Sequence, residues 1–279
     1  MAVEREWWAV DKVIVAYLLF TTLLTVIWFA AIPGAAWILI AHAAAMAAWI
    51  AFRTNFAFHC WYPLPYVAAC YKEMAILIPP IRGHDYDEWA SRVDRALWGT
   101  DPILWLVHRP NAAITEFLQI AYSLFIPVVL VVAYLLWRQR KFDEFRYYAF
   151  LIALGFLASY LGYLAAPVRG PRFWLHSLPP LRGLWLTTAL QNTLDRLESA
   201  HYDCFPSGHT ELTMLACWGS RMVSRKLFYV FLGYTPCIIF ATVYLRYHYT
   251  IDVLAGALLA FALILVAPYV YTRLEKRGR

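Results

Sequence analysis

Long apolar runs separated by short polar segments are the dominant pattern along this chain. A helix that crosses the hydrocarbon core of a membrane needs about 20 mostly apolar residues. Clear runs of this kind lie near residues 12–32, 35–52, 117–137, 146–166, 209–222, 227–245 and 251–272. Another run, near residues 60–81, is weaker because Lys72 and Glu73 interrupt it and prolines bracket it. The pattern predicts a bundle of membrane-spanning helices, about eight of them if residues 60–81 also cross.

Composition supports a membrane protein and argues against an ordinary soluble domain. Hydrophobic residues make up 62% of the 279 residues, charged residues make up 15%, and the mean hydropathy is +0.54. Soluble domains are about 45–50% apolar and about 25% charged. No internal repeat or glycine/serine linker divides the chain. We therefore expect an all-α, polytopic membrane bundle, with an N-terminal transmembrane hairpin over residues 1–55 and a six-helix membrane domain over residues 56–279.

The basic residues predict an orientation. The net charge is +6, but the cations lie in short loops between apolar runs, which is typical of topology-setting charge and not of nucleic-acid binding. Two spans separate each basic cluster from the next, so all three clusters fall on one side, which should be cytoplasmic. The clusters are Arg138, Arg140, Lys141 and Arg146; Arg221, Arg225 and Lys226; and Arg273, Lys276, Arg277 and Arg279. We expect an integral protein of a bacterial cytoplasmic membrane, with its C-terminus in the cytoplasm and residues 167–208 and 246–250 on the outer, periplasmic side.

His248 and Asp252 stand four residues apart at the outer edge of the run 251–272. Ionisable residues at such a position are costly to place and indicate a functional site. If the following helix includes both residues, they share one face, and the carboxylate can orient the imidazole. The spacing predicts a histidine base held by an acidic partner.

A second histidine, His209, follows Pro206, Ser207 and Gly208 at the start of the run 209–222. Proline and glycine here favour a sharp start to a helix, whose first free N–H groups favour an anion. The sequence therefore predicts a phosphate-binding site that includes Ser207 and Gly208. A zinc site formed by the two histidines and the aspartate is the less favoured alternative.

Arginines in two loops on the same side complete the candidate chemistry. Arg169 and Arg172 lie between prolines and a glycine just after the run 146–166, and Arg246 precedes His248 by two residues. A guanidinium fork matches phosphate oxygens. Arginines at span ends are often anchors that extend to the membrane interface, but the two nearby histidines favour phosphate binding.

Two stretches on the expected outer side have the pattern of amphipathic helices, residues 183–199 and 86–98. The apolar stripe is Leu186, Leu190, Leu194 and Leu197 in the first, and Trp89, Val93 and Leu97, opposite Asp87, Arg92 and Asp94, in the second. Such helices lie in the membrane interface. Each either caps the bundle or gates the access of lipid to the site.

Three elements in this order, each beside a predicted span, resemble the signature motifs of the type-2 phosphatidic acid phosphatase superfamily: Gly170-Pro171-Arg172, Pro206-Ser207-Gly208-His209 and His248-x3-Asp252. The first element and the run from His248 to Val253 are similar to inositol phosphorylceramide synthases and sphingomyelin synthases. The motifs cover about residues 165–255, and the spans from about residue 60 onward match a six-helix core. The resemblance implies that His248 is the nucleophile, Asp252 its orienter and His209 the general acid and base, with Arg172 and Arg246 as phosphate ligands.

The chain departs from the hydrolase branch of this family at two points. That branch usually has a lysine where this chain has Ala165, and a Ser-Arg pair where it has Ala241 and Thr242. Arg246 can replace the missing arginine from another position. These departures favour the transferase branch.

We therefore expect a membrane enzyme that transfers a phosphate-bearing headgroup from a phospholipid donor to a lipid alcohol, in phospholipid or sphingolipid metabolism. It would work through a phosphohistidine and need no metal or other cofactor. The alternative is a lipid phosphate phosphatase that hydrolyses a lipid phosphomonoester or diphosphate, with water as the acceptor. A transporter is a third possibility, which the nearly apolar middles of the spans disfavour.

Several polar residues remain beside this site. Glu211 and Asp203 are candidates for a supporting role, since both lie close to the motif that contains His209. His42 is expected to pack between helices. His59 is expected in a loop or at the membrane interface, with no predicted partner.

Overall fold

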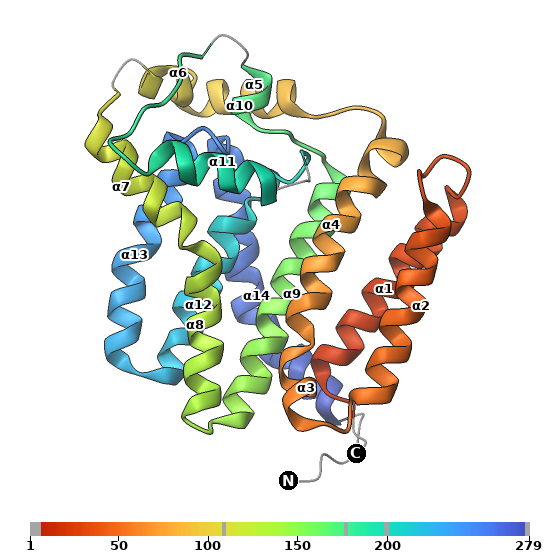
Figure 1. Cartoon of the computed structure of the whole chain (residues 1–279). Helices are drawn as coiled ribbons and strands as arrows, with labels where there is room; N and C mark the ends of the chain where they lie inside the picture. Colours follow the sequence, from red (N-terminus) through yellow and green to blue (C-terminus); the bar gives the residue numbers. More distant parts are fainter. Residues whose placement is uncertain (1–6, 108–109, 176–177, 198–200, 277–279) are drawn as a thin grey trace.

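The computed structural model describes residues 7–107, 110–175, 178–197 and 201–276, and these form a bundle of α-helices (Figure 1). The long helices of the bundle are α1 (Ala9–Ile27), α2 (Ala35–Phe52), α4 (Pro63–Arg82), α7 (Ala112–Ser123), α8 (Phe125–Arg138), α9 (Phe142–Ala165), α12 (Gly208–Val223), α13 (Arg225–Tyr244) and α14 (Thr250–Lys276). The short helices are α3 (Phe56–Trp61), α5 (Asp87–Trp98), α6 (Pro102–Val107), α10 (Pro171–Trp174) and α11 (Thr187–Leu197). Four short helices, α5, α6, α10 and α11, lie at one end of the bundle, and the start of α1 and the end of α14 lie at the other (Figure 1).

The lengths and compositions of the helices confirm the predicted all-α polytopic membrane bundle. Helices α1, α2, α9, α13 and α14 are each long and apolar enough to cross a membrane, and the bent pair α7 and α8 counts as a sixth candidate. Helices α4 and α12 lie within the same bundle, and each packs against α9. Helix α4 occupies the position of the weaker run at residues 60–81.

The run predicted as one span over residues 117–137 is two helices, bent by 43° at Leu124. Pro127 favours the break. A proline ring lacks an N–H and clashes with the carbonyl four residues earlier, which here is Ser123, the last residue of α7. The aromatic rings on either side of the break, Tyr122 and Phe125, pack against His209, with ring centroids 4.5 and 4.4 Å from the imidazole.

The N-terminal hairpin packs onto the rest of the bundle through α1, which contacts α4, α9 and α14. Asp11 is fully buried there, and its carboxylate interacts with His59 Nε2 at 2.9 Å and accepts a hydrogen bond from the Tyr62 hydroxyl. The His59 ring also stacks on Trp8 at 3.7 Å. His59 is thus a buried residue of α3, and the expectation that it has no partner is wrong. The division at residue 55 stays a prediction.

Glu73 on α4 and His42 on α2 face each other inside the bundle. The distance from His42 Nε2 to Glu73 Oε1 is 3.1 Å, and His42 Nδ1 lies 2.7 Å from the Thr22 hydroxyl on α1. The expectation that the middles of the spans are nearly apolar therefore fails at this position. Polar contacts between helices hold helices together in a membrane, so these residues join the hairpin to α4.

A labelling experiment tests the orientation of the bundle. It asks which side of the membrane the end with α5, α6, α10 and α11, here called the capped end, faces. Ser177, in the expected outer loop, lies outside the described residues, but Trp185 at the same end is 86% exposed. In a background without reactive cysteines, Trp185→Cys should react with an impermeant thiol reagent added to intact cells. Glu144→Cys, at the start of α9 beside a basic cluster, should react only after permeabilisation. The opposite pattern would place the capped end in the cytoplasm.

Candidate active site

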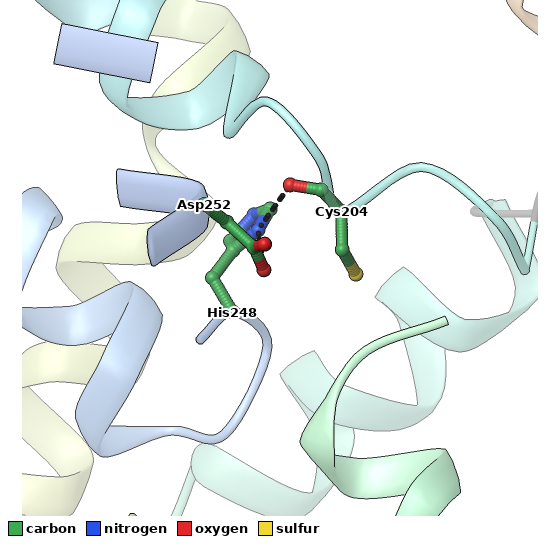
Figure 2. A group of neighbouring side chains, drawn as sticks. All are labelled: Cys204, His248 and Asp252. Atoms are coloured by element: carbon green, nitrogen blue, oxygen red, sulfur yellow. Dashed lines mark hydrogen bonds and ion pairs between the residues drawn. The ribbon is translucent and has the colours of Figure 1, made fainter. Parts of the chain in front are cut away.

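His248 and Asp252 lie together (Figure 2), at the start of α14, and α5 and α11 lie at the same end of the bundle (Figure 1). Both are buried, and His248 Nδ1 is 3.6 Å from Asp252 Oδ2. Helix α14 begins only at Thr250, so the two residues do not share a helical face as the spacing predicted. The carboxylate instead turns back and accepts a hydrogen bond from the Tyr249 N–H at 2.9 Å. The first turn of α14 thus fixes the carboxylate against the imidazole.

The hydrogen bonds of His248 assign its tautomer. Nδ1 lies 3.0 Å from the backbone carbonyl oxygen of Cys204, which points at the ring in Figure 2. A carbonyl oxygen only accepts, so we place the proton on Nδ1. Burial lowers the pKa of His248 to about 4, so the ring is neutral near pH 7. The nitrogen with a free electron pair is therefore Nε2.

His209 lies in the first turn of α12 and faces His248. The distance from His209 Nδ1 to His248 Nε2 is 3.3 Å. Because Nε2 is the acceptor, Nδ1 of His209 is the donor in this contact. The structure therefore brings His209, His248 and Asp252 together, and it presents an electron pair on one ring to a proton on the other.

Arg172 and Arg246 come from adjacent loops, joined by a hydrogen bond from the Arg172 N–H to the Arg246 carbonyl at 3.2 Å. The Arg172 guanidinium lies over the Tyr247 ring at 4.4 Å, and its Nη1 is 2.6 Å from Asp195 Oδ1 on α11. Arg246 is mostly buried, its φ is 68°, and its Nη1 donates to the carbonyl of Pro179 at 2.5 Å. Burial lowers the pKa of Arg246. Both guanidinium groups thus hold parts of the chain that follow α10.

Gly170 lies in the loop that carries Arg169 and Arg172, here called the arginine loop. It allows this loop to approach the loops that carry Cys204 and Tyr247, and we call the three together the motif loops. The φ of Gly170 is +95°, and a Cβ at this position would lie 2.6 Å from the Tyr247 carbonyl oxygen and 2.7 Å from Cys204 Sγ. Only glycine fits such a place without strain. In the neighbouring residue, Arg169, Nε is buried without a hydrogen-bond partner in the described parts of the chain. That group has a donor available for a ligand.

Ser207 and Gly208 form the start of α12. The Ser207 hydroxyl accepts hydrogen bonds from the N–H and the hydroxyl of Thr210, at 3.3 and 3.1 Å. The Ser207 N–H donates to the Asp252 carbonyl at 2.9 Å. Gly256 on α14 permits this approach, because a Cβ there would overlap the Ser207 carbonyl. Ser207 therefore caps α12 and ties it to α14, and its binding of phosphate stays a prediction.

Glu211 and Asp203 have partners on other helices. Glu211 is fully buried one turn into α12, and its carboxylate accepts a hydrogen bond from the Ser159 hydroxyl on α9. Asp203 accepts a hydrogen bond from the Tyr71 hydroxyl on α4 at 2.6 Å. Glu211 is therefore bound to α9 and not to an arginine of the site, whereas Asp203 ties the loop before Cys204 to α4.

Two carboxylates on α5, Asp87 and Asp94, contact the motif loops and were missed as site residues. Both are fully buried, while Leu97 of the predicted apolar stripe is 53% exposed. The face of α5 that turns toward the site thus combines these two acids with Trp89 of the predicted apolar stripe, whereas Arg92 of the predicted polar side is exposed. Burial raises the pKa of Asp87 to about 6. The seven-residue spacing, which places both acids on one helical face, was the signal that could have found them.

Glu116 on α7 holds the start of α11. Its carboxylate accepts hydrogen bonds from the N–H groups of Leu184 at 2.9 Å and Leu186 at 2.6 Å, and from the Thr187 hydroxyl at 2.7 Å. An anion at a helix N-terminus is favourable. Helix α11 is therefore attached to α7 at one end and to Arg172 near the other.

Cys204, His248 and Asp252 each offer one atom of a kind that binds metals, and these atoms lie within 4.8 Å of one another. Cys204 Sγ donates to the Tyr247 carbonyl at 3.3 Å, and burial raises the pKa of the thiol. A metal would need the thiolate and a free ring nitrogen. The geometry fits a histidine and an aspartate that are each held by a backbone hydrogen bond better than it fits a metal centre. Chemistry without a metal stays a prediction.

Comparison with known proteins gives one result. A family model described as the PAP2 superfamily matches residues 88–266. This range begins in α5, includes every motif described above and ends within α14, whereas the N-terminal hairpin lies outside it. Neither the curated proteins nor the solved structures contain a match.

Proposed function

The chain belongs to the PAP2 superfamily, and on that premise we propose that it transfers a phosphate-bearing headgroup between lipids through a phosphohistidine at His248. Membership in this superfamily supports a lipid phosphatase or phosphotransferase. The observation that carries the proposal is the 3.3 Å contact from His248 Nε2 to His209 Nδ1, with Asp252 behind His248. A phosphate group that enters between the rings meets an electron pair on one side and a proton on the other.

In the first step, the electron pair of His248 Nε2 attacks phosphorus, and the bond from phosphorus to the oxygen of the donor lipid breaks. His209, protonated on both ring nitrogens when substrate is bound, gives its Nδ1 proton to that oxygen, so the lipid leaves as a neutral alcohol and His209 becomes neutral. The Asp252 carboxylate stabilises the positive charge that develops on the His248 ring. The headgroup phosphate is then bonded to His248.

In the second step, the hydroxyl of the acceptor gives its proton to His209 and attacks phosphorus. The bond from phosphorus to His248 breaks, and the electron pair returns to Nε2. A lipid alcohol as acceptor yields a new phospholipid or sphingolipid, and water yields a free headgroup phosphate. The outcome is set by which hydroxyl reaches the intermediate first.

The arginines are the proposed ligands of the phosphate oxygens. In phosphoryl transfer, charge spreads over the equatorial oxygens, so a protein contributes chiefly positioning and cationic groups. Arg172 and Arg246 can supply charged forks, and Arg169 and the N–H groups around Gly208 can supply further donors. To bind substrate, Arg172 would exchange its contact with Asp195 for one with phosphate.

Transfer is favoured over hydrolysis by two features. The residues at the hydrolase-type positions are Ala165, Ala241 and Thr242, and Leu194 of α11 packs against the cluster that contains Tyr122 and Tyr247, so α11 can limit the access of water. Exclusion of water protects a reactive intermediate from hydrolysis. The alternative is a lipid phosphate phosphatase.

We place the reaction at the outer face of the membrane, because the basic loops lie at the opposite end.

Product analysis tests the proposal. Purified protein is incubated with labelled phospholipids and a panel of lipid alcohols that includes diacylglycerol and ceramide, and the products are separated. We expect a transferred lipid product that depends on one of the alcohols. If every alcohol leaves only the hydrolysis product, the phosphatase alternative replaces the transferase. If no lipid phosphate reacts at all, both are wrong.

The apolar side of α11 provides a second test of transfer. Leu194 is partly buried against the cluster that contains Tyr122 and Tyr247, beside His209, and Leu190 is also partly buried. Replacing Leu190 and Leu194 with Ser should raise the ratio of free headgroup phosphate to transferred lipid, because water then reaches the intermediate more easily. Total turnover should fall less than in His248→Ala.

The matched control is Leu197→Ser on the same helix. Leu197 is 61% exposed and Leu186 is 50% exposed, so neither end of the predicted stripe is packed against the bundle. Leu197→Ser should leave the product ratio unchanged. An unchanged ratio in the Leu190 and Leu194 variant would disprove the role of α11 as a lid without affecting the proposed chemistry.

A further inference from the structure

Helix α5 contacts all three loops that carry the motif residues. The N–H of Tyr86, the residue before α5, donates to the Pro167 carbonyl at 2.8 Å in the arginine loop. The Trp89 ring packs at 90° on Phe205, with centroids 5.3 Å apart, in the loop before His209. The third loop, which carries His248, is bound by acidic side chains of α5. A single helix thus links parts of the site that are distant in the sequence.

Asp94 binds the start of α14. Its Oδ2 accepts from the Thr250 N–H at 2.8 Å, and its Oδ1 accepts from the Thr250 hydroxyl at 2.7 Å and the Ile251 N–H at 2.9 Å. An N-cap residue normally satisfies such orphan N–H groups from within its own chain segment. Here a carboxylate from another helix does so, two residues after His248 and one before Asp252.

Asp87 binds the arginine loop. Its carboxylate accepts hydrogen bonds from the N–H groups of Arg169 at 2.8 Å and Gly170 at 2.9 Å, and from the Tyr249 hydroxyl at 3.2 Å. Two successive N–H groups aimed at one carboxylate fix the direction of the backbone that leads to Arg172. The Tyr249 contact also joins this loop to the one that carries His248.

We propose that Asp94 and Asp87 are positioning residues of the reaction, Asp94 for the His248–Asp252 pair and Asp87 for the arginine loop. The proposal rests on the proposed function, in which these groups react with and bind phosphate. Each carboxylate is fully buried, and a buried carboxylate is costly unless it is well hydrogen-bonded. An apolar helix could cover the same end of the bundle, but it could not fix the backbone N–H groups beside the reacting side chains.

The two residues should affect different kinetic constants. Displacement of a reacting group by about 1 Å can lower a rate about 100-fold, so loss of the Asp94 contacts should lower kcat. Loss of an interaction that binds ground state and transition state equally raises KM and leaves kcat unchanged. Because Asp87 holds the loop of the proposed phosphate ligands, its loss should chiefly raise KM.

The experiment compares Asp94→Asn, Asp87→Asn and Glu88→Gln in the full-length protein, with the phospholipid donor identified by product analysis. We expect Asp94→Asn to lower kcat about tenfold or more, with KM within about twofold of wild type. Asp87→Asn should raise KM about tenfold, with a smaller change in kcat. Glu88, on the same helix and with a side chain that is 70% exposed, should tolerate the change to Gln with both constants unchanged.

Unfolding midpoints in detergent separate positioning from stability. Both aspartate variants could instead show the same fall in kcat and the same rise in KM, together with a lower unfolding midpoint. That result would mean that α5 only stabilises the fold. Wild-type constants in both would also overturn the proposal. If Asp94→Asn does not fold, Thr250→Val removes the hydroxyl donor from the other side of the contact, and it should lower kcat without raising KM. A dead His248→Ala beside normal aspartate variants would leave the proposed function intact and remove only this inference.

Discussion

His248→Ala should abolish turnover while the protein stays folded. The variant removes Nε2, the only ring nitrogen of His248 with an electron pair, and His209 has no such nitrogen facing it. Loss of the nucleophile in an enzyme with covalent catalysis lowers kcat by a large factor, here about 1000-fold or more. The fold should survive, because in the described part of the chain the His248 ring makes its polar contacts only with the first turns of α12 and α14 and the loop at Cys204, and not with the middle of the bundle.

The measurement is the conversion of a labelled phospholipid by purified wild type and variant at equal concentration. His84→Ala is the matched control, since His84 is exposed in the turn before α5. That variant should keep full activity. Gel filtration and circular dichroism in detergent establish that His248→Ala is folded. Activity within about tenfold of wild type would rule out His248 as the nucleophile.

Gly170→Ala should disrupt the site almost as severely without touching any proposed catalytic group. A Cβ at residue 170 would lie 2.6 Å from the Tyr247 carbonyl oxygen, which is backbone and cannot move alone. Strain at φ +95° adds about 1–3 kcal/mol, and overpacking adds a similar amount. The loop that carries Arg172 has to shift, and we expect a loss of activity of about 100-fold.

The control for this variant is Gly233→Ala on α13, where a Cβ would meet nothing within 4 Å. Alanine is favoured over glycine in a helix by about 1 kcal/mol, so this variant should be as stable as wild type or more stable. Unfolding midpoints and lipid turnover are measured for both variants. If the Gly170→Ala protein has the unfolding midpoint and the activity of wild type, the close approach of the arginine loop to Tyr247 is needed neither for stability nor for turnover.

The sequence predicted those features that depend on neighbouring residues. Runs of apolar residues predicted the helices, and the number of spans between the basic clusters predicted that His209 and His248 lie at one end of the bundle. The bend at Leu124 was only partly within reach, because Pro127 favours a break there but α13 and α14 continue through Pro236 and Pro268. The prediction treated the run as one span because hydropathy alone does not register a proline.

What could not be predicted depends on partners far along the chain. Asp94 is buried only because Thr250 and Ile251 bring hydrogen-bond donors to it from another helix. Without those donors a carboxylate belongs in water, and α5 was therefore given a solvent-facing polar side. The same reason applies to His59, whose burial depends on Asp11. The pattern of α5 showed that the helix has two faces but not which one turns inward.

The contact of Arg172 with Asp195 makes α11 an internal competitor of the substrate. If Arg172 binds phosphate as proposed, any phosphate has to displace a carboxylate that is tethered beside it at 2.6 Å. The apparent dissociation constant equals the intrinsic one divided by the fraction of molecules in which the pair is open. A lipid phosphate brings acyl chains whose burial can offset this loss, whereas inorganic phosphate brings only charge. On the proposed role of Arg172, the contact would weaken the binding of both ligands by the same factor, so Asp195→Asn should lower the inhibition constants of inorganic phosphate and of a lipid phosphate about equally.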